Sequence, residues 1–168
     1  MISTRSIKAN EWQAYRDMRL RALQDSPEAF ASTHESEAAR ADEDWAARVA
    51  AALASGNDLV LLAFKGDQAC GLAWCKLPLA EIAVADLYQM WVDPALRGQG
   101  AGAALIEHVL AWARDRGVRR IRLGVTYAQT PAMQMYKAYG FHPVGALEPL
   151  RAGSSLMSQA MELELAPV

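Results

Sequence analysis

Residues 92–117 read VDPALRGQGAGAALIEHVLAWARDRG, and this stretch joins an apolar strand to a helix through a cluster of glycines. Gly98, Gly100 and Gly102 stand close together, directly after Arg97. Glycine inside a helix or strand costs up to about 1 kcal/mol relative to alanine, so three glycines at one place require a reason. We infer that something must approach the backbone closely here.

The start of the helix that follows predicts a site for an anion. The first amides of a helix have no acceptor within the helix, and the helix dipole places partial positive charge beside them. The forked guanidinium of Arg97 suits phosphate oxygens. We therefore expect a pyrophosphate to lie against the main-chain N–H groups of Gly98, Gln99, Gly100, Ala101 and Gly102. A glycine loop needed only for a sharp turn is the alternative, although one glycine would satisfy it.

Two other phosphate-binding patterns fit this stretch less well. A P-loop ends in Gly-Lys-Ser/Thr, and no lysine is present here. The dinucleotide fingerprint fits formally as Gly98, Gly100 and Ala103, but DPALR separates the strand from the first glycine. The acidic residue expected after the next strand is also missing, because YAQT follows IRLGVT. A nicotinamide-dependent oxidoreductase is thus a distant alternative.

Hydrophobic periodicity and turn residues predict a mixed sheet flanked by helices, in the α/β (α+β-like) class. The second helix carries an apolar stripe of Trp45, Val49 and Leu53. The strand–helix–strand order around the glycines implies one parallel pair, and the other strands look antiparallel. We expect strands at 2–8, 58–64, 68–77, 82–92, 119–126, 141–145 and 156–165, and helices after Asn10, at 42–54, at 100–116 and after Thr130.

Composition restricts the class of protein further. The 168 residues carry a net charge of −2 and are 52% hydrophobic, which suits one folded domain spanning 1–168 and argues against a nucleic-acid or membrane partner. With no secretory signal visible, we expect a cytoplasmic protein. The three scattered histidines and two cysteines predict no metal site. Cys70 and Cys75 have an odd separation, so we expect them on opposite faces of their strand, as inert packing residues.

The chain resembles the GNAT superfamily of N-acetyltransferases. That family's acetyl-CoA motif is matched by RGQGAG, which places Arg97, Gly100 and Gly102 at the family spacing. A second motif is matched by LGVTYAQTPAMQMYKAYGF, with Gln129 standing where the family often has asparagine. The matching positions of this second motif are Ala132, Tyr136, Gly140 and Phe141.

The resemblance implies a GNAT fold with acetyl-CoA, a cosubstrate, in a slot between two splayed parallel strands, 86–92 and 121–126. A bulge in the first strand would free backbone groups of Met90, Trp91 and Val92 to pair with the pantetheine arm, and Gln129 would contact the cofactor. Their side chains could equally be ordinary core.

The resemblance also implies direct attack by an amine in a ternary complex. Tyr136 would be the general acid beside the cofactor sulfur and a further cofactor contact. Asp86 is the candidate base, with Glu81 or a chain of waters as alternatives, and Tyr88 could contact substrate or pack in the core. A covalent route through Cys70 or Cys75 is a weaker alternative.

The same resemblance places the acceptor amine, of a small molecule or peptide, opposite the cofactor. Loops 24–33 and 147–156 are the candidate specificity segments, with Phe30, Glu28 and Glu148 as possible contacts. A non-catalytic sensor that binds acyl-CoA is the alternative function, and a homodimer is possible.

Overall fold

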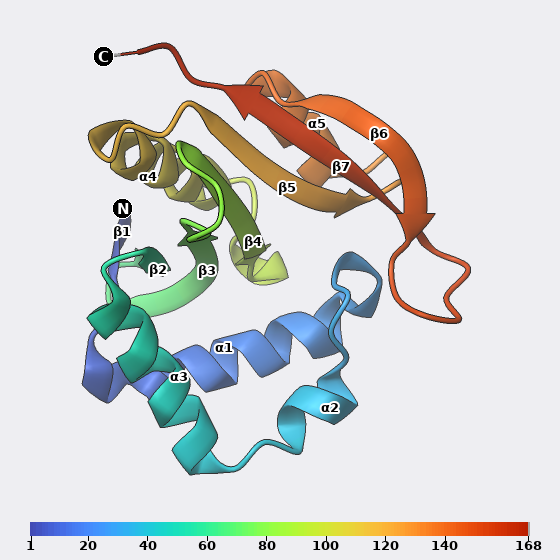
Figure 1. Ribbon diagram of the computed structural model, residues 1–168. Helices are drawn as coiled ribbons and strands as arrows, with labels where there is room; N and C mark the ends of the chain where they lie inside the picture. Colours follow the sequence, from blue (N-terminus) through green and yellow to red (C-terminus); the bar gives the residue numbers. More distant parts are fainter. Residues whose placement is uncertain (168) are drawn as a thin grey trace.

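Seven strands form one sheet in the computed structural model, which describes residues 1–167, and helices cover both faces (Figure 1). The strand order is β1-β2-β3-β4-β5-β7-β6, and only β4 and β5 are parallel. The predicted fold class, a mostly antiparallel mixed sheet with one central parallel pair, is therefore confirmed. The strands are β1 (Ile2–Ser6), β2 (Asp58–Lys65), β3 (Gln68–Lys76), β4 (Val84–Val92), β5 (Arg120–Thr126), β6 (His142–Pro149) and β7 (Met157–Glu164).

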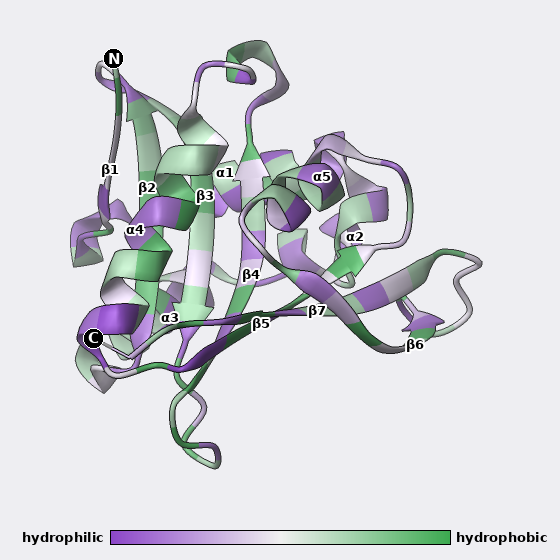
Figure 2. Ribbon diagram, turned by 90° about the horizontal axis from the view of Figure 1, so that it is seen from above, coloured by the Kyte–Doolittle hydropathy of each residue, from purple (hydrophilic) through white to green (hydrophobic). Residues whose placement is uncertain are grey.

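The helices divide between the two faces of the sheet. Figure 1 shows α1, α2 and α3 on one side and α4 and α5 on the other, and Figure 2 shows α4 lying across the first strands. No helix within residues 1–167 is both long and apolar enough to cross a membrane. The helices are α1 (Trp12–Asp25), α2 (His34–Ala38), α3 (Asp42–Ser55), α4 (Ala101–Asp115) and α5 (Pro131–Ala138).

Each face of the sheet has its own apolar core. Leu105 and Val109 of α4 pack with Ile121 of β5 on one face. On the other face, Tyr15 of α1 lies edge-on to Trp45 of α3 and to Trp74 of β3. Burial of such side chains contributes roughly 1.5–3 kcal/mol each. The central strands are apolar on both faces because helices cover both faces of the sheet.

The helix predictions need two corrections. Asn10 is not the N-cap of α1: it lies in a 3-10 turn (Ala9–Glu11) that precedes the helix. Leu53 is 43% exposed, and Ala52 takes the inward position. A helix has 3.6 residues per turn, so residues spaced by four gradually rotate away from the buried face. After Val49, the next buried position is therefore 52 rather than 53. The short helix α2 was not predicted.

The two cysteines do not face opposite sides of β3; both pack into the core against α4. The β2–β3 ladder shifts register where Ala63 pairs with Gly71 and Phe64 pairs with Ala69. Cys70 is the extra residue in this bulge, and one inserted residue reverses the alternation of side chains. Burial raises the pKa of both thiols, that of Cys75 to about 12, which agrees with an inert packing role.

Gly71 of β3 lies against the backbone of β4 with no room for a side chain. A Cβ there would lie 2.8 Å from the backbone oxygen of Trp91, which cannot move without shifting β4. We predict that Gly71→Ala lowers the free energy of unfolding by about 1–3 kcal/mol in denaturant titrations. The matched control is Gly124→Ala in β5, where the nearest atom is the rotatable Ser158 hydroxyl at 3.2 Å. Equal losses in both variants would contradict this explanation.

Candidate active site

β4 and β5 pair with each other over only three residues. The parallel ladder joins Val84–Asp86 to Arg120–Arg122 and ends there. Beyond it β4 continues along β3 and β5 continues along β7, so the two strands diverge as Figure 1 shows. The facing edges keep backbone groups that no sheet ladder pairs, and an extended ligand can pair with such groups. The divergence implied by the resemblance is present.

A bulge in β4 lies beside this open edge. Leu72 pairs with Trp91 and Trp74 pairs with Tyr88, so Ala73 alone opposes two residues, Gln89 and Met90. The resemblance implied a bulge at residues 90–92, and the structure has it at Gln89 and Met90.

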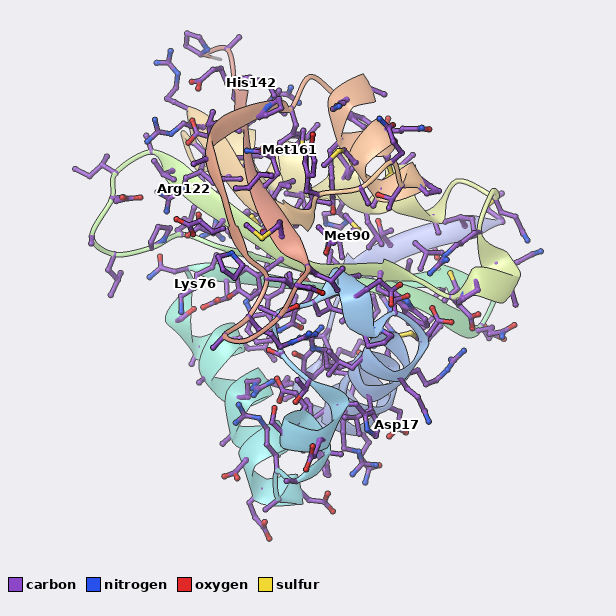
Figure 3. The ribbon with its side chains drawn as sticks, turned by 90° about the vertical axis from the view of Figure 1, so that its right-hand side faces the viewer. Asp17, Lys76, Met90, Arg122, His142 and Met161 are labelled. Atoms are coloured by element: carbon purple, nitrogen blue, oxygen red, sulfur yellow. The ribbon has the colours of Figure 1, made fainter. Side chains whose placement is uncertain are left out.

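Gln89 has a φ of +60°, which is rare for a non-glycine residue and typical of functional sites. The Tyr15 hydroxyl donates a 2.7 Å hydrogen bond to Gln89 Oε1, so α1 supports the bulge. Figure 3 labels Met90 on β4 and Arg122 on β5, and the two residues lie well apart in this view.

The glycine loop exposes main-chain donors at the end of β4. Gly98 and Gly100 adopt φ of +78° and +93°, which glycine alone adopts easily, and α4 then begins at Ala101. Within residues 1–167, the amides of Gly98, Gln99 and Gly100 make no hydrogen bond to a backbone acceptor. Donors of this kind at a helix start fit a phosphate group.

Gly102 serves a second purpose, because it lets α4 approach α5. A Cβ at this position would lie 3.0 Å from the Met135 sulfur. The sequence analysis gave all three glycines one explanation. In the structure the glycines have two different explanations. Positions 98 and 100 require glycine for their backbone conformation, and position 102 requires it for a close packing contact.

Arg97 is held beside the end of β4. Its Nε donates to the Val92 carbonyl at 2.9 Å, and its Nη2 lies 3.4 Å from Asp25 Oδ2 on α1. Half of the side chain is exposed, and Nη1 hydrogen-bonds no group among residues 1–167. The guanidinium thus has a donor available next to the glycine loop.

Tyr136 lies on α5, which begins as predicted at Pro131 with the Thr130 hydroxyl accepting from the Met133 amide at 3.2 Å. The ring is 6% exposed and packs edge-on against Phe141. In residues 1–167, the side-chain polar atoms that are fully buried and lack a hydrogen-bond partner belong to Arg19 and Arg120. The Tyr136 hydroxyl is not one of these atoms, so it keeps some access to solvent. Burial raises the pKa of Tyr136 well above its usual range, so the phenol stays protonated at neutral pH.

The candidate bases lie at the closed end of the strand pair. Arg122 donates to both oxygens of Asp86, at 2.7 and 3.1 Å, and its Nη1 lies 2.6 Å from Glu81 Oε2. The structure therefore brings both predicted carboxylates together through an arginine that sequence reasoning missed. Within the described part of the chain, no three His, Cys, Asp or Glu side chains are grouped to hold a metal ion.

The remaining predicted side chains take varied positions. Tyr88 is 38% exposed and stacks on Trp74, with ring centroids 6.1 Å apart. Gln129 is exposed in the turn between β5 and α5. Glu28 and Glu148 are exposed, whereas Phe30 is buried.

The two predicted specificity loops touch each other. Arg151, between β6 and β7, donates to the backbone oxygens of Pro27 and Phe30 at 2.8 and 2.9 Å. Thr126, the last residue of β5, donates to the Glu28 carbonyl at 2.6 Å. These contacts join the segment after α1 to the far end of β5, opposite the bulged β4.

Comparison with known proteins agrees with this geometry. The family model described as "Acetyltransferase (GNAT) family" matches residues 13–141. An N-acetyltransferase from Staphylococcus aureus Mu50 has the same fold, with a TM-score of 0.82, 15% identity and 99% coverage of both chains. A Salmonella typhimurium protein solved with its cofactor acetyl-CoA gives a TM-score of 0.80 at 18% identity, covering 100% of this chain and 96% of that one.

The chain belongs to the GNAT acetyltransferase family, which confirms the resemblance drawn from the two motifs. The mycothiol acetyltransferase of Beutenbergia cavernae is 33% identical over 135 residues, covering 80% of this chain and 42% of that protein. The chain spans less than half the length of the curated relatives it matches.

Gly100 offers a direct test of the anion site. We predict that Gly100→Val, which puts a β-branched residue at φ +93°, weakens acetyl-CoA binding about tenfold or more in calorimetric titrations, through displaced amide donors. The control is Gly56→Val at the end of α3, which has φ +69° and equally open surroundings. It should suffer a similar loss of stability without any loss of acetyl-CoA affinity. Wild-type affinity in Gly100→Val would contradict the assignment.

Proposed function

We propose that the protein is an acetyl-CoA-dependent N-acetyltransferase that acetylates a primary amine of a small molecule or peptide by direct attack in a ternary complex. The observation that carries this proposal is a pair of features at one edge of β4. Beyond Asp86, β4 has no ladder to β5 and carries a bulge at Gln89 and Met90, and the amides of Gly98, Gln99 and Gly100 follow the same strand without a backbone acceptor in residues 1–167. Family membership supports it.

This chain's residues divide the binding of the cosubstrate between them. Backbone groups of Met90, Trp91 and Val92 would pair with the pantetheine arm. The amides of residues 98–102, with Arg97, would hold the pyrophosphate, because left-handed glycines and unbonded donors fit that group. Gln129 would contact the arm from the β5 side. Acetyl-CoA supplies an acetyl thioester, whose C–S bond is exchanged for the C–N bond of an amide.

Positioning and proton transfer are what the protein must add. Tyr136 would give its proton to the leaving thiolate, since its phenol is neutral at working pH. The amine must lose a proton, and Asp86 is our candidate acceptor. Each of its carboxylate oxygens accepts one hydrogen bond from Arg122, and a proton taken from the amine would use a remaining lone pair of that carboxylate. Glu81 or a water chain remain the alternatives.

Two further predictions belong to the same proposal. Residues 1–168 would form a single N-acetyltransferase domain, which the one continuous sheet supports, and two copies would form a homodimer. A non-catalytic acyl-CoA sensor is not favoured, because the curated relatives are named as acetyltransferases.

Removing the Tyr136 hydroxyl tests whether Tyr136 is the general acid that protonates the leaving thiolate. We expect Tyr136→Phe to lower kcat by roughly 10²–10⁴-fold in a thiol-release assay with amines, while KM for acetyl-CoA changes little. Tyr139→Phe, on the same segment, is the control and should retain kcat. Full activity of Tyr136→Phe across the pH range would show that another group protonates the thiolate.

The base is tested by comparing two carboxylates that share one arginine. If Asp86 accepts the proton, Asp86→Asn lowers kcat/KM by about 10²-fold in the thiol-release assay. Glu81→Gln, which leaves the Asp86–Arg122 pair in place, should keep kcat/KM close to the wild-type value. An unchanged kcat/KM in Asp86→Asn would assign the proton to Glu81 or to water.

A further inference from the structure

Arg19 is a buried cation for which residues 1–167 supply no hydrogen-bond acceptor. It lies on the inward face of α1, is 3% exposed, and its Nε and Nη1 are fully buried without a partner in residues 1–167. The guanidinium lies over the Phe30 ring, 4.8 Å from its centroid. A buried charge is costly unless an opposite charge and hydrogen bonds compensate it.

The charges around Arg19 do not balance it. The ionisable groups that face it are Tyr15 and Glu37, with Arg48 adding like charge. The Glu37 carboxylate is already engaged, by Arg40 Nε at 2.5 Å and Arg48 Nη2 at 3.3 Å. Three guanidinium groups therefore share one carboxylate, which leaves a local excess of positive charge. Burial lowers the pKa of Arg19, although an arginine remains protonated in any protein.

The position of Arg19 relates this charge to the acceptor side of the site. Tyr15, one helical turn before Arg19, hydrogen-bonds the bulge residue Gln89. Phe30, which the guanidinium covers, gives its backbone oxygen to Arg151 of the second specificity loop. The helix that carries Arg19 thus contacts the β4 bulge through Tyr15, and Arg19 itself contacts the residue that the second loop binds. With Nε and Nη1 buried, Nη2 is the guanidinium nitrogen left with access.

We propose that the acceptor is an amine that also carries a carboxylate, and that Arg19 binds this carboxylate beside Phe30. The inference rests on the proposed N-acetyltransferase activity and names its substrate class. A carboxylate would supply the missing negative charge and accept hydrogen bonds from the guanidinium. Because Tyr15, one turn before Arg19 on the same helix, contacts Gln89, the amine end of a small amino acid would extend from Arg19 toward the bulge.

The test uses acceptors that differ only in this charge. Glycine, β-alanine and γ-aminobutyrate are compared with their amides in a thiol-release assay with acetyl-CoA. The enzymes are wild type, Arg19→Gln, Arg19→Lys and the control Arg16→Gln, which changes an exposed-side arginine of the same helix. For each enzyme, kcat/KM for the acid is divided by kcat/KM for the matching amide. These ratios are then compared between enzymes, because the intrinsic reactivity of each amine cancels in that comparison.

We expect wild type and Arg16→Gln to prefer the acid. Arg19→Gln should reduce that preference roughly 30-fold or more, mainly through KM of the acceptor, with KM for acetyl-CoA unchanged. Arg19→Lys should keep part of it. A wild-type ratio near one, or an equal preference in Arg19→Gln, overturns the proposal.

A binding measurement separates this proposal from the proposed function. Calorimetry of the wild-type protein with the same acids and amides, in the presence of coenzyme A, needs neither turnover nor a folded variant. Tighter binding of acids without acetyl transfer would refute the activity and support the carboxylate site. Transfer to acids and amides alike, with equal affinity, would support the activity and refute the carboxylate site.

Discussion

Three residues of parallel pairing, Val84–Asp86 against Arg120–Arg122, hold the two parts of the sheet together at the closed end of the site. The Arg122–Asp86 ion pair spans the last rung of this ladder. Past it β4 bends away through its bulge and β5 turns toward β7. Because the pairing stops there, backbone groups of both strands face open space, and every proposed ligand contact depends on that break.

The parts of the site follow one another along β4, starting from the point where the β4–β5 pairing ends. The carboxylates lie at that point, the bulge and Tyr15 come next, and the glycine loop lies at the end of β4. On the opposite strand, the end of β5 is tied to the segment after α1 through Thr126 and Glu28. A cosubstrate along β4 and an acceptor arriving between the two loops would therefore meet near the bulge. Arg19 contacts Phe30, in the first of these loops, and is on the helix whose Tyr15 supports the bulge.

Local chemistry explains which features the sequence predicted. The glycine loop, the crossover helix and the Thr130 cap depend on neighbouring residues, and each was found at its predicted place. The bulge lies at Gln89 and Met90 rather than at residues 90–92, and a non-glycine residue with positive φ leaves no local signal in the sequence. Arg122 was overlooked, because its role depends on strand register, and Arg19 because its burial depends on how α1 meets Phe30.

The central claim, that acetyl-CoA lies along the open edge of β4 and on the glycine loop, is tested most directly by amide hydrogen exchange resolved to single residues. Addition of acetyl-CoA should slow exchange at residues 90–92 and 98–102. Amides of β1 and β2, on the far side of the sheet, should be unchanged. Protection confined to other parts of the chain, or no protection at saturating acetyl-CoA, would contradict the account.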